Sequence, residues 1–514
     1  MKNQLIVFGL SACLAWSCTT PEQATFTNPV IHGDMPDPSV IRIDDTYYAT
    51  GTSSEWAPFY PMYTSKDLVN WAQVGHVFTE KPAWTSNSFW APELFRHNGK
   101  VFCYYTARQK ATGISYIGVA SADSPLQEFT DHGPIIEYGK EAIDAFVFED
   151  NGRLYISWKA YGLDQRPIEL LGSELSADGL HLVGEPFTLL KDDEGIGMEG
   201  QYHFKKDGYY YILYSVRGCC GPSSDYAVYV ARSKNFRGPY EKYTGNPVLQ
   251  GGDGDFLSCG HGTVVDTPDG RMFYLFHAYL KGEEFYEGRQ PVLQELAMTA
   301  DHWVRFKTGN IARRMQEMPF KGTVQRPLQD FEDDFSGEKL RMEWTWNYPY
   351  ADIDATLKDG CLQLTGTPHE GNHYGTALCL RPQWPHYRIE TQVDGHHAIF
   401  QGLTLYGDDK NLIMWGVEGD RWILKSVQDG TEKTLYADTC SPQKPFLKVE
   451  VAKGCQFRFY RSGDGKQWTA VTEEAVEGSF LTRWDRVQRP GLLHSGDSVR
   501  PARFTYFAMK HLKE

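Results

Sequence analysis

The sequence has no C-x-x-C pair, no run of lysines and arginines, and no apolar stretch long enough to cross a bilayer. Without closely spaced cysteines a zinc or redox centre is not expected, although ten cysteines are present. The formal net charge is −15, and phosphate binding needs clustered positive charge, so a nucleic-acid partner is not expected. What the chain does have is aromatic residues, 14% of the total, which suit pleated strands.

The first residues read as an export signal. Lys2 gives a short positive start, and the apolar run from Leu5 to Leu10 is too short for a spanning helix. The segment closes on Cys18, which resembles the lipidated cysteine of bacterial lipoproteins, while Cys13 is an alternative acceptor and simple secretion an alternative fate. We expect a signal in residues 1–18, a tether in 19–27, and an exported protein in the periplasm or anchored to the outer membrane. Its only membrane contact would be a lipid on Cys18.

Export permits disulfides, but their connectivity stays open at this stage. The adjacent pair Cys219-Cys220 is unusual, and the sequence leaves two thiols or a local bridge in a loop as its explanations.

Five segments repeat one pattern, in which a short apolar strand, a tight turn and an aromatic-rich strand follow a polar or aromatic residue. The segments begin at Asp37, Trp90, Asp144, Glu199 and His261. Four of the turns are Asn-Gly or Asp-Gly, a strong hairpin signal. The turns lie at positions 45, 98, 151, 207 and 269, so they are 53, 53, 56 and 62 residues apart. These intervals suit four-stranded blades, and the sequence predicts a five-bladed β-propeller over residues 28–310.

In a propeller the starts of the inner strands meet at the central axis, so the five segment-opening residues should surround one pocket. Loops after the second strands return to the same face, among them the segment that carries Trp56. Three of the axial residues, Asp37, Asp144 and Glu199, are carboxylates, and crowding such charges is costly unless they have a function. Water attack on an acetal needs a base and an acid, about 6.5–9.5 Å apart in an inverting enzyme. A third carboxylate near the acid would raise the pKa of the acid and keep it protonated.

These segments, with Trp90-Ala91-Pro92-Glu93 and Gly260-His261-Gly262, resemble glycoside hydrolase family 43 over about residues 28–310. The resemblance implies that Asp37 is the general base, Glu199 the general acid and Asp144 the residue that tunes and orients the acid. It also implies that His261 helps hold a calcium ion or water near the axis, and that Arg289 contacts sugar hydroxyls. No cofactor is required for the chemistry. The sequence departs from the family pattern at Ala145 and at Gly200-Gln201, where proline is usual in each case.

Residues 311–330 read as a connector. From 331 to 514 short strands alternate with Gly/Asp turns, among them 387–393, 402–406, 412–417 and 422–426, and predict an antiparallel β-sandwich. This region resembles the concanavalin-like domain that follows some family 43 catalytic domains, and we expect it to support the propeller rather than to bind sugar.

The hypothesis from sequence is therefore an exo-acting, inverting glycosidase that releases terminal α-L-arabinofuranose or β-D-xylose from plant cell-wall hemicellulose side chains or oligosaccharides. Trp90 and Trp56 are candidate sugar contacts, with core packing as the alternative for Trp90. The motifs of fructan-processing enzymes and sialidases are missing. A non-catalytic surface glycan-binding lipoprotein is the alternative from another class, and it predicts the loss of one axial carboxylate, yet all three are present.

Overall fold

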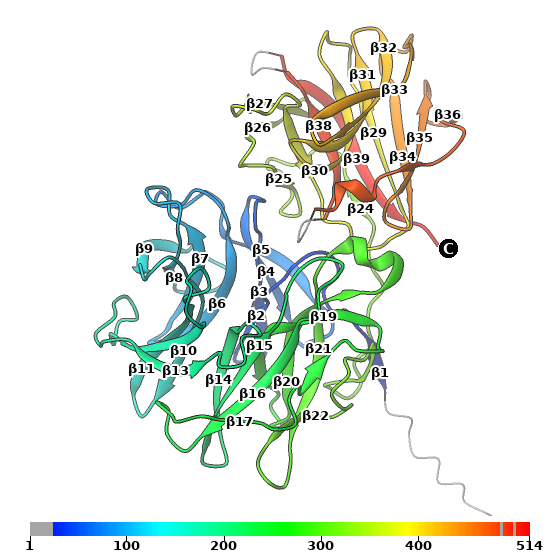
Figure 1. The fold of residues 1–514 in the computed structure, drawn as a ribbon. Helices are drawn as coiled ribbons and strands as arrows, with labels where there is room; N and C mark the ends of the chain where they lie inside the picture. Colours follow the sequence, from blue (N-terminus) through cyan, green and yellow to red (C-terminus); the bar gives the residue numbers. More distant parts are fainter. Residues whose placement is uncertain (1–23, 484–486, 497–499, 514) are drawn as a thin grey trace, which may run out of the picture.

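The computed structural model describes residues 24–483, 487–496 and 500–513, which form two all-β domains (Figure 1). The chain builds the first domain from blue to green and the second from yellow to red. The predicted signal and the lipidation site at Cys18 lie outside the described residues. Within the described ranges, no helix is long and apolar enough to cross a membrane.

The first domain is the predicted five-bladed propeller. Each blade is one antiparallel sheet whose strands follow the order of the chain, except that β18 also pairs with β16. The strands are, by blade, β2 (Ser39–Ile43), β3 (Thr46–Thr50), β4 (Phe59–Ser65), β5 (Ala72–Phe78); β6 (Trp90–His97), β7 (Lys100–Arg108), β8 (Ser115–Ala122), β9 (Thr130–Ile136); β10 (Ala142–Asp150), β11 (Arg153–Ala160), β12 (Glu169–Leu175), β13 (Phe187–Lys191); β14 (Glu199–Lys206), β15 (Tyr209–Val216), β16 (Ala227–Ser233), β17 (Glu241–Lys242), β18 (Leu249–Gln250); and β19 (Phe256–Asp266), β20 (Met272–Leu280), β21 (Gln290–Met298), β22 (Val304–Phe306).

Apolar clusters between neighbouring blades hold the propeller together. One cluster joins the first and second blades, and four others join the remaining pairs, including the fifth blade to the first. Burial of the aromatic strands between two sheets supplies the main stabilisation, because apolar area removed from water contributes about 25 cal/mol per Å². The aromatic-rich second strands of the repeat therefore form the core between blades.

The hairpin turns explain why the repeat can be recognised in the sequence. Three turns have positive φ at both positions, as at Asn98 (49°) and Gly99 (78°), which matches the right-handed twist of the strands. The first turn has positive φ only at Asp44, 55°. The fifth turn differs from the prediction, because Thr267 to Arg271 form a longer loop in which only Gly270 has positive φ. Thr267 Oγ1 hydrogen-bonds to Asp269 Oδ1 at 2.5 Å inside this loop.

The connector runs back along the propeller. Its strand β23 (Met315–Glu317) pairs with β1 (Thr25–Thr27), the first strand of the described chain. Gln325 and Thr27 exchange two hydrogen bonds, both 2.8 Å long. The start of the described chain is thereby fixed beside the fifth blade.

The second domain is the predicted antiparallel sandwich. One sheet has the order β26-β27-β39-β29-β34-β35-β36, with β24 paired to β39 and β37 to β35, and the other has the order β25-β28-β38-β30-β31-β32-β33. Its strands are β24 (Phe331–Asp333), β25 (Thr345–Trp346), β26 (Ala351–Lys358), β27 (Cys361–Pro368), β28 (Thr376–Cys379), β29 (Tyr387–Val393), β30 (Gln401–Asp408), β31 (Asn411–Glu418), β32 (Arg421–Gln428), β33 (Thr431–Thr439), β34 (Phe446–Ala452), β35 (Gln456–Ser462), β36 (Thr469–Ala470), β37 (Val476–Glu477), β38 (Arg489–His494) and β39 (Ala502–His511). A cluster that includes Trp415 and Phe507 fills the space between the sheets.

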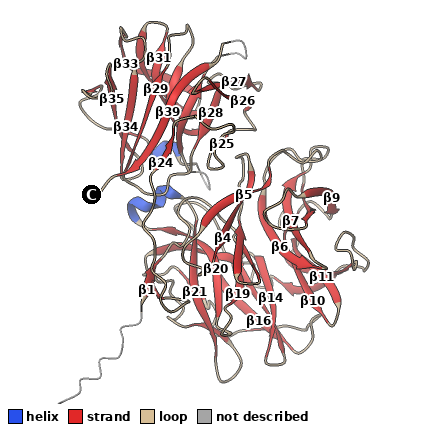
Figure 2. Cartoon of the chain, turned by 180° about the vertical axis from the view of Figure 1, so that it is seen from behind, coloured by secondary structure: helices blue, strands red, loops and turns tan. Residues whose placement is uncertain are grey.

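Two short 3₁₀ segments, η1 (Gly282–Glu287) and η2 (Ser479–Leu481), lie near the junction of the domains (Figure 2). Glu283 of η1 meets the sandwich through His386 at 2.9 Å and Lys453 at 3.4 Å. The backbones of Ala57 and Trp346 exchange two hydrogen bonds across the junction. The sandwich thus contacts loops of the first and fifth blades, the two blades that carry Asp37 and His261.

Candidate active site

Each innermost strand has, within it or just before it, an axial residue with a left-handed backbone. These residues are Asp37 (φ 54°), Ala91 (41°), Asp144 (60°), Gly200 (58°) and His261 (44°). The first four lie seven residues before the first residue of their hairpin turn: 37 and 44, 91 and 98, 144 and 151, 200 and 207. Non-glycine residues rarely adopt positive φ, and such strain is concentrated at functional sites.

This register corrects the sequence alignment of two blades. Ala91 and Gly200, rather than Trp90 and Glu199, are the equivalents of Asp37, Asp144 and His261. Glu199 lies one residue earlier, opposite Ser215 on the next strand, as Trp90 lies opposite Thr106. A pattern of apolar residues alone does not distinguish seven residues from eight, and the backbone geometry does.

The five left-handed residues are joined in a ring of hydrogen bonds. The backbone N–H of each donates to a side chain of the preceding blade: Asp37 to His277 Nδ1 (3.1 Å), Ala91 to Thr52 Oγ1 (2.7 Å), Asp144 to Thr106 Oγ1 (3.1 Å), Gly200 to Asp144 Oδ2 (3.0 Å) and His261 to Ser215 Oγ (2.8 Å). Every link crosses from one blade to the next, and the link from Asp37 of the first blade to His277 of the fifth closes the circle. Buried N–H groups need such partners, so the ring fixes the axial residues in place.

Asp37 is buried among cationic and hydroxyl groups. Thr52 Oγ1 donates to Asp37 Oδ2 at 2.6 Å, and His261 Nδ1 and Arg289 Nη1 lie 3.3 Å and 3.7 Å from Oδ1. Burial alone would raise the pKa of Asp37, but the charges of Arg289 and His261 outweigh it and hold the pKa well below its usual range. Asp37 is therefore a carboxylate at neutral pH, as a general base must be.

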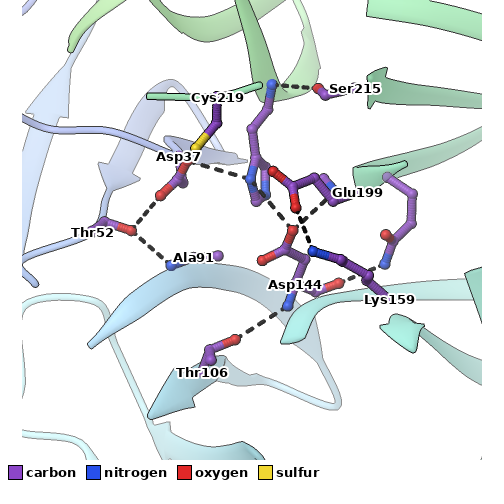
Figure 3. A network of polar contacts seen from close by, with 12 residues as sticks. Asp37, Thr52, Ala91, Thr106, Asp144, Lys159, Glu199, Ser215 and Cys219 are labelled. Atoms are coloured by element: carbon purple, nitrogen blue, oxygen red, sulfur yellow. Dashed lines mark hydrogen bonds and ion pairs between the residues drawn. The ribbon is translucent and has the colours of Figure 1, made fainter. Parts of the chain in front are cut away.

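His261 connects Asp37 to Asp144. Its Nδ1 atom lies 3.3 Å from Asp37 Oδ1 and 3.8 Å from Asp144 Oδ2, and Figure 3 labels both aspartates. Burial lowers the pKa of His261, but Asp144 and Asp37 more than offset this and raise the pKa to about 9. The pKa of Asp144 is raised to about 7, mainly by burial. The charge of His261 lowers this pKa, and the charge of Glu199 raises it. Near neutral pH, Asp144 therefore gains and loses a proton.

Glu199 faces a lysine. Lys159 Nζ, at the end of β11, lies 2.7 Å from Glu199 Oε2, and Tyr226 donates its hydroxyl to Oε1 at 3.0 Å. Burial raises the pKa of Glu199, but the Lys159 charge and its hydrogen bond outweigh burial, and the pKa is lowered. The expectation that a third carboxylate raises the pKa of the acid is thus wrong in sign for Glu199. The pKa of Asp144 is raised instead, mainly by burial, and the charge of Glu199 acts in the same direction.

His277 supports Asp37 as a neutral ring. Burial lowers the pKa of His277 to about 4, and its Nδ1 accepts the Asp37 N–H. The ring stacks on Tyr226 with centroids 5.7 Å apart and planes 10° apart. Tyr226 therefore contacts both His277, which supports Asp37, and Glu199 itself.

The residues around His261 do not fit a metal site. Among the described residues, no group of three or more His, Cys, Asp or Glu side chains is arranged to hold a metal ion. The Nδ1 atom of His261 faces two carboxylates as a donor, which leaves it no lone pair for a cation. A calcium ion at His261 stays a prediction.

The two predicted tryptophans lie in different surroundings. Trp90 begins β6 and is partly exposed. Trp56 is 7% exposed and packs into the junction with the sandwich, edge-to-face on Tyr406, with Arg489 over its ring at 4.2 Å. Trp56 therefore offers no open ring face to a sugar, and its contacts are those of an interdomain anchor.

Sequence reasoning missed four residues that touch the carboxylates: Thr52, Lys159, Tyr226 and His277. For Lys159 a signal was available, because Lys159 pairs with Ile143, next to Asp144, in the strand register. Thr106 and Ser215 occupy the same position opposite the inner strands of their own blades. Tyr226 and His277 gave no such signal, because their roles depend on how two blades pack together.

The arrangement provides a fixed carboxylate, a carboxyl that titrates near neutral pH, and a third carboxyl held by a lysine. These groups come from three blades and face one axis (Figure 3). Such a set activates a water with one carboxylate and protonates a leaving oxygen with another, which is the chemistry of acetal hydrolysis.

Comparisons with known proteins agree with this chemistry. The family model described as glycosyl hydrolases family 43 matches residues 26–304, more than half of the chain. A second model, described as the beta xylosidase C-terminal concanavalin A-like domain, matches residues 332–490. Among solved structures, the GH43 BlXynB protein from Bacillus licheniformis superposes with a TM-score of 0.82 at 24% identity, covering 95% of this chain and 100% of that chain. This likeness shows the shared two-domain fold.

Characterised relatives carry two kinds of names. A xylan 1,3-beta-xylosidase from a Vibrio species is 28% identical over 405 residues, 72% of this chain and 74% of the relative. A non-reducing end alpha-L-arabinofuranosidase, BoGH43B from Bacteroides ovatus, is 29% identical over 394 residues, 71% and 70%. A beta-xylosidase from Bacillus subtilis is 27% identical over 553 aligned positions, 94% and 99%.

Proposed function

Because the chain belongs to glycosyl hydrolases family 43, we propose that it is an exo-acting, inverting glycosidase that releases terminal pentoses from hemicellulose side chains or oligosaccharides. The observation that carries the proposal is the convergence of Asp37, Asp144 and Glu199 from three blades around the His261 ring. The pKa of Asp37 is well below that of Asp144, and groups whose pKa values are pushed apart in this way divide into base and acid roles.

In the proposed reaction Asp37 accepts a proton from a water molecule. The oxygen of that water bonds to the anomeric carbon as the bond to the leaving oxygen breaks, and Glu199 gives its proton to the leaving oxygen. One water is consumed, and the configuration at the anomeric carbon inverts. Asp37 ends protonated and Glu199 ionised, so a proton returns to Glu199 before the next cycle.

The proton that Glu199 delivers is shared with Asp144. With Lys159 at 2.7 Å, Glu199 is the more acidic of the pair, and at neutral pH the shared proton is on Asp144. A bound sugar excludes water from both carboxyls and favours their neutral forms, and in the proposed cycle the proton passes from Asp144 to Glu199 as the leaving oxygen approaches. The role of Asp144 is to store this proton and, through the Gly200 N–H, to hold the neighbouring backbone of Glu199.

Sugar specificity stays open between arabinofuranose and xylose. The relatives named above act, by their names, on xylosides and on arabinofuranosides, and both sugars are pentoses. Arg289 lies beside Asp37 at the base of the site, and we propose that it donates to the hydroxyls of the terminal sugar.

The test is the hydrolysis of aryl α-L-arabinofuranoside and aryl β-D-xyloside, side by side, by protein that lacks residues 1–18. Turnover of either supports the proposal, and the faster one names the sugar. The first-formed anomer, followed by proton NMR, should be inverted relative to the substrate. No turnover of either by folded protein, or retention of configuration, would contradict the proposal, and the first result would favour a glycan-binding role.

We also propose that the protein is exported and anchored through a lipid on Cys18, on the basis of the N-terminal pattern. In cells fed a labelled fatty acid, the full chain should carry label and the Cys18→Ala variant should not. Label that persists in this variant would instead point to Cys13.

A further inference from the structure

The loop between β15 and β16 starts and ends at residues that contact His261 and Glu199 of the axial site. β15 carries Ser215, which accepts the N–H of His261 at 2.8 Å, and ends one residue later. The loop from Arg217 to Asp225 follows, and the next residue is Tyr226, whose hydroxyl donates to Glu199 at 3.0 Å. Both ends of the loop are thus tied to the axial site.

Within this loop Cys219 and Cys220 form a disulfide between adjacent residues. The other six cysteines that the structure describes are free thiols, and all of them are buried. Cys219 and Cys220, in contrast, are partly exposed. Figure 3 shows the sulfur of Cys219 pointing toward Asp37.

Hydrogen bonds hold the disulfide against the fifth blade. Ser258, three residues before His261 in β19, donates its hydroxyl to the Cys219 carbonyl. The N–H of Gly221 donates to the Tyr279 hydroxyl at 3.2 Å, and Ser224 closes the loop by donating to the Gly218 carbonyl at 2.6 Å. The sulfur pair is therefore held in a fixed position against the fifth blade.

The chemistry of the surrounding groups shows what this wall adds. Apart from Trp90, the groups described around the axis are charged or hydrogen-bonding, and they suit the hydroxyls and the breaking bond of a sugar. A pentose also has C–H faces, which need an apolar, polarizable surface, and Trp56 does not supply one because its ring is used by the domain junction. A disulfide presents two adjacent sulfur atoms and no strong donor, so it suits a C–H face.

We propose that the Cys219–Cys220 disulfide is a specificity-determining wall of the sugar site. It packs against the C–H face of the pentose whose glycosidic bond Asp37 and Glu199 help to hydrolyse. The proposal rests on the proposed function and names the contact that distinguishes the terminal sugar. Because the bridge ties adjacent residues, it holds the two sulfurs together at one place. Reduction separates them and frees the loop backbone, which weakens sugar binding without altering any carboxyl.

The experiment compares three forms of protein lacking residues 1–18: oxidised wild type, wild type reduced with excess dithiothreitol, and the variant C219S/C220S. Dithiothreitol breaks the bridge by thiol exchange, yielding two thiols and oxidised dithiothreitol, and titration of free thiols confirms it. The structure describes no other disulfide in the ranges 24–483, 487–496 and 500–513, so reduction is specific to this pair. KM, kcat and the inhibition constant of free pentose are measured on whichever aryl pentoside the oxidised protein hydrolyses.

Reduction and the double substitution should each raise KM and the inhibition constant about threefold to tenfold, as expected for lost sulfur contacts. In both forms kcat should stay within about twofold of its value in the oxidised protein. The pKa values of the pH profile should stay within about 0.3 pH units. The double variant should not respond to dithiothreitol, which controls for effects of the reductant elsewhere.

Equal KM and inhibition constants in the three forms would overturn the proposal, as would a fall in kcat with unchanged KM, which would mean that the bridge shapes the carboxyl geometry instead. If the double variant does not fold, the comparison of reduced with oxidised wild type still tests the proposal. Failure of oxidised wild type to turn over any pentoside would refute the proposed function itself, a result distinct from turnover that is insensitive to reduction.

Discussion

Replacing Lys159 with methionine tests how the site distributes its protons. Lys159 Nζ lies 2.7 Å from Glu199 Oε2 and 3.7 Å from Glu141 Oε2, and the three side chains are 12%, 22% and 13% exposed. At 2.7 Å and an effective dielectric constant of about 20, the gross attraction to Glu199 is about 6 kcal/mol. The cost of burying both charges offsets much of this, and we expect the pKa of Glu199 to rise when the lysine is removed.

The assay is kcat/KM against pH with a pentoside whose leaving group is poor and needs protonation. In the wild type, kcat/KM should decrease on the alkaline side with a midpoint near pH 7, where Asp144 loses the shared proton. Without the lysine the carboxyl pair keeps its proton to higher pH, and the limb should move up by about 1–2 units. With an activated leaving group that needs no acid, the two profiles should coincide.

Lys140→Met is the matched control. Lys140 lies in the same blade and pairs with Asp164 at 3.3 Å, but its side chain is 67% exposed, so its loss should leave the limb in place. If K159M is folded and its alkaline limb lies within 0.3 units of the wild type, the lysine does not set the pKa of the acid, and the reasoning is refuted.

The same substitution should change stability in a pH-dependent way. Because the folded-state pKa of Glu199 is lowered, its ion pair stabilises the fold above the unfolded pKa, about 4.3, and is lost as pH falls through the folded value. K159M should therefore be destabilised at pH 7 and approach the wild type at low pH, which denaturant melts at several pH values will show.

Three further changes test other contacts. Glu199→Gln should lower kcat/KM about 10²–10⁴-fold on poor leaving groups and much less on activated ones, and equal losses on both would contradict its role as acid. Thr52→Val removes the 2.6 Å hydrogen bond to Asp37 and should raise the acidic pKa of the pH profile and lower kcat/KM about tenfold; an unchanged acidic limb would argue against this support. Trp56→Ala should cost about 3–5 kcal/mol of unfolding free energy by emptying the junction under Arg489, while KM changes little. A large rise in KM with normal stability would restore its assignment as a sugar contact.

The fold was predictable because its repeating unit is local. Asn98-Gly99, Asn151-Gly152 and Asp207-Gly208 each form the tight hairpin that their residue types favour, and the aromatic strands that follow fill the spaces between blades. The exact register was less predictable. A shift of one residue separates Glu199 from Gly200, and only the left-handed backbone identifies which of them is equivalent to Asp144.

The carboxylates of the site could be found from the sequence, whereas their electrostatics could not. Asp37, Asp144 and Glu199 stand at comparable places in a repeat, but which of them keeps a proton depends on Lys159, Arg289 and the buried His261. Those contacts cross from blade to blade, so no local pattern records them. For the same reason the place of Trp56 was missed, since its partners Tyr406 and Arg489 lie in the other domain.

The ring of hydrogen bonds has a consequence for assembly. Its closing link joins Asp37 to His277, 240 residues further along the chain, so the first blade is complete only after the fifth has formed. During synthesis the backbone N–H of Asp37, the carboxylate that activates the water, has no hydrogen-bond partner until the last blade supplies His277. Enzymatic activity should therefore appear in a single step when the circle closes, and it can serve as a sensitive reporter of that event in refolding experiments.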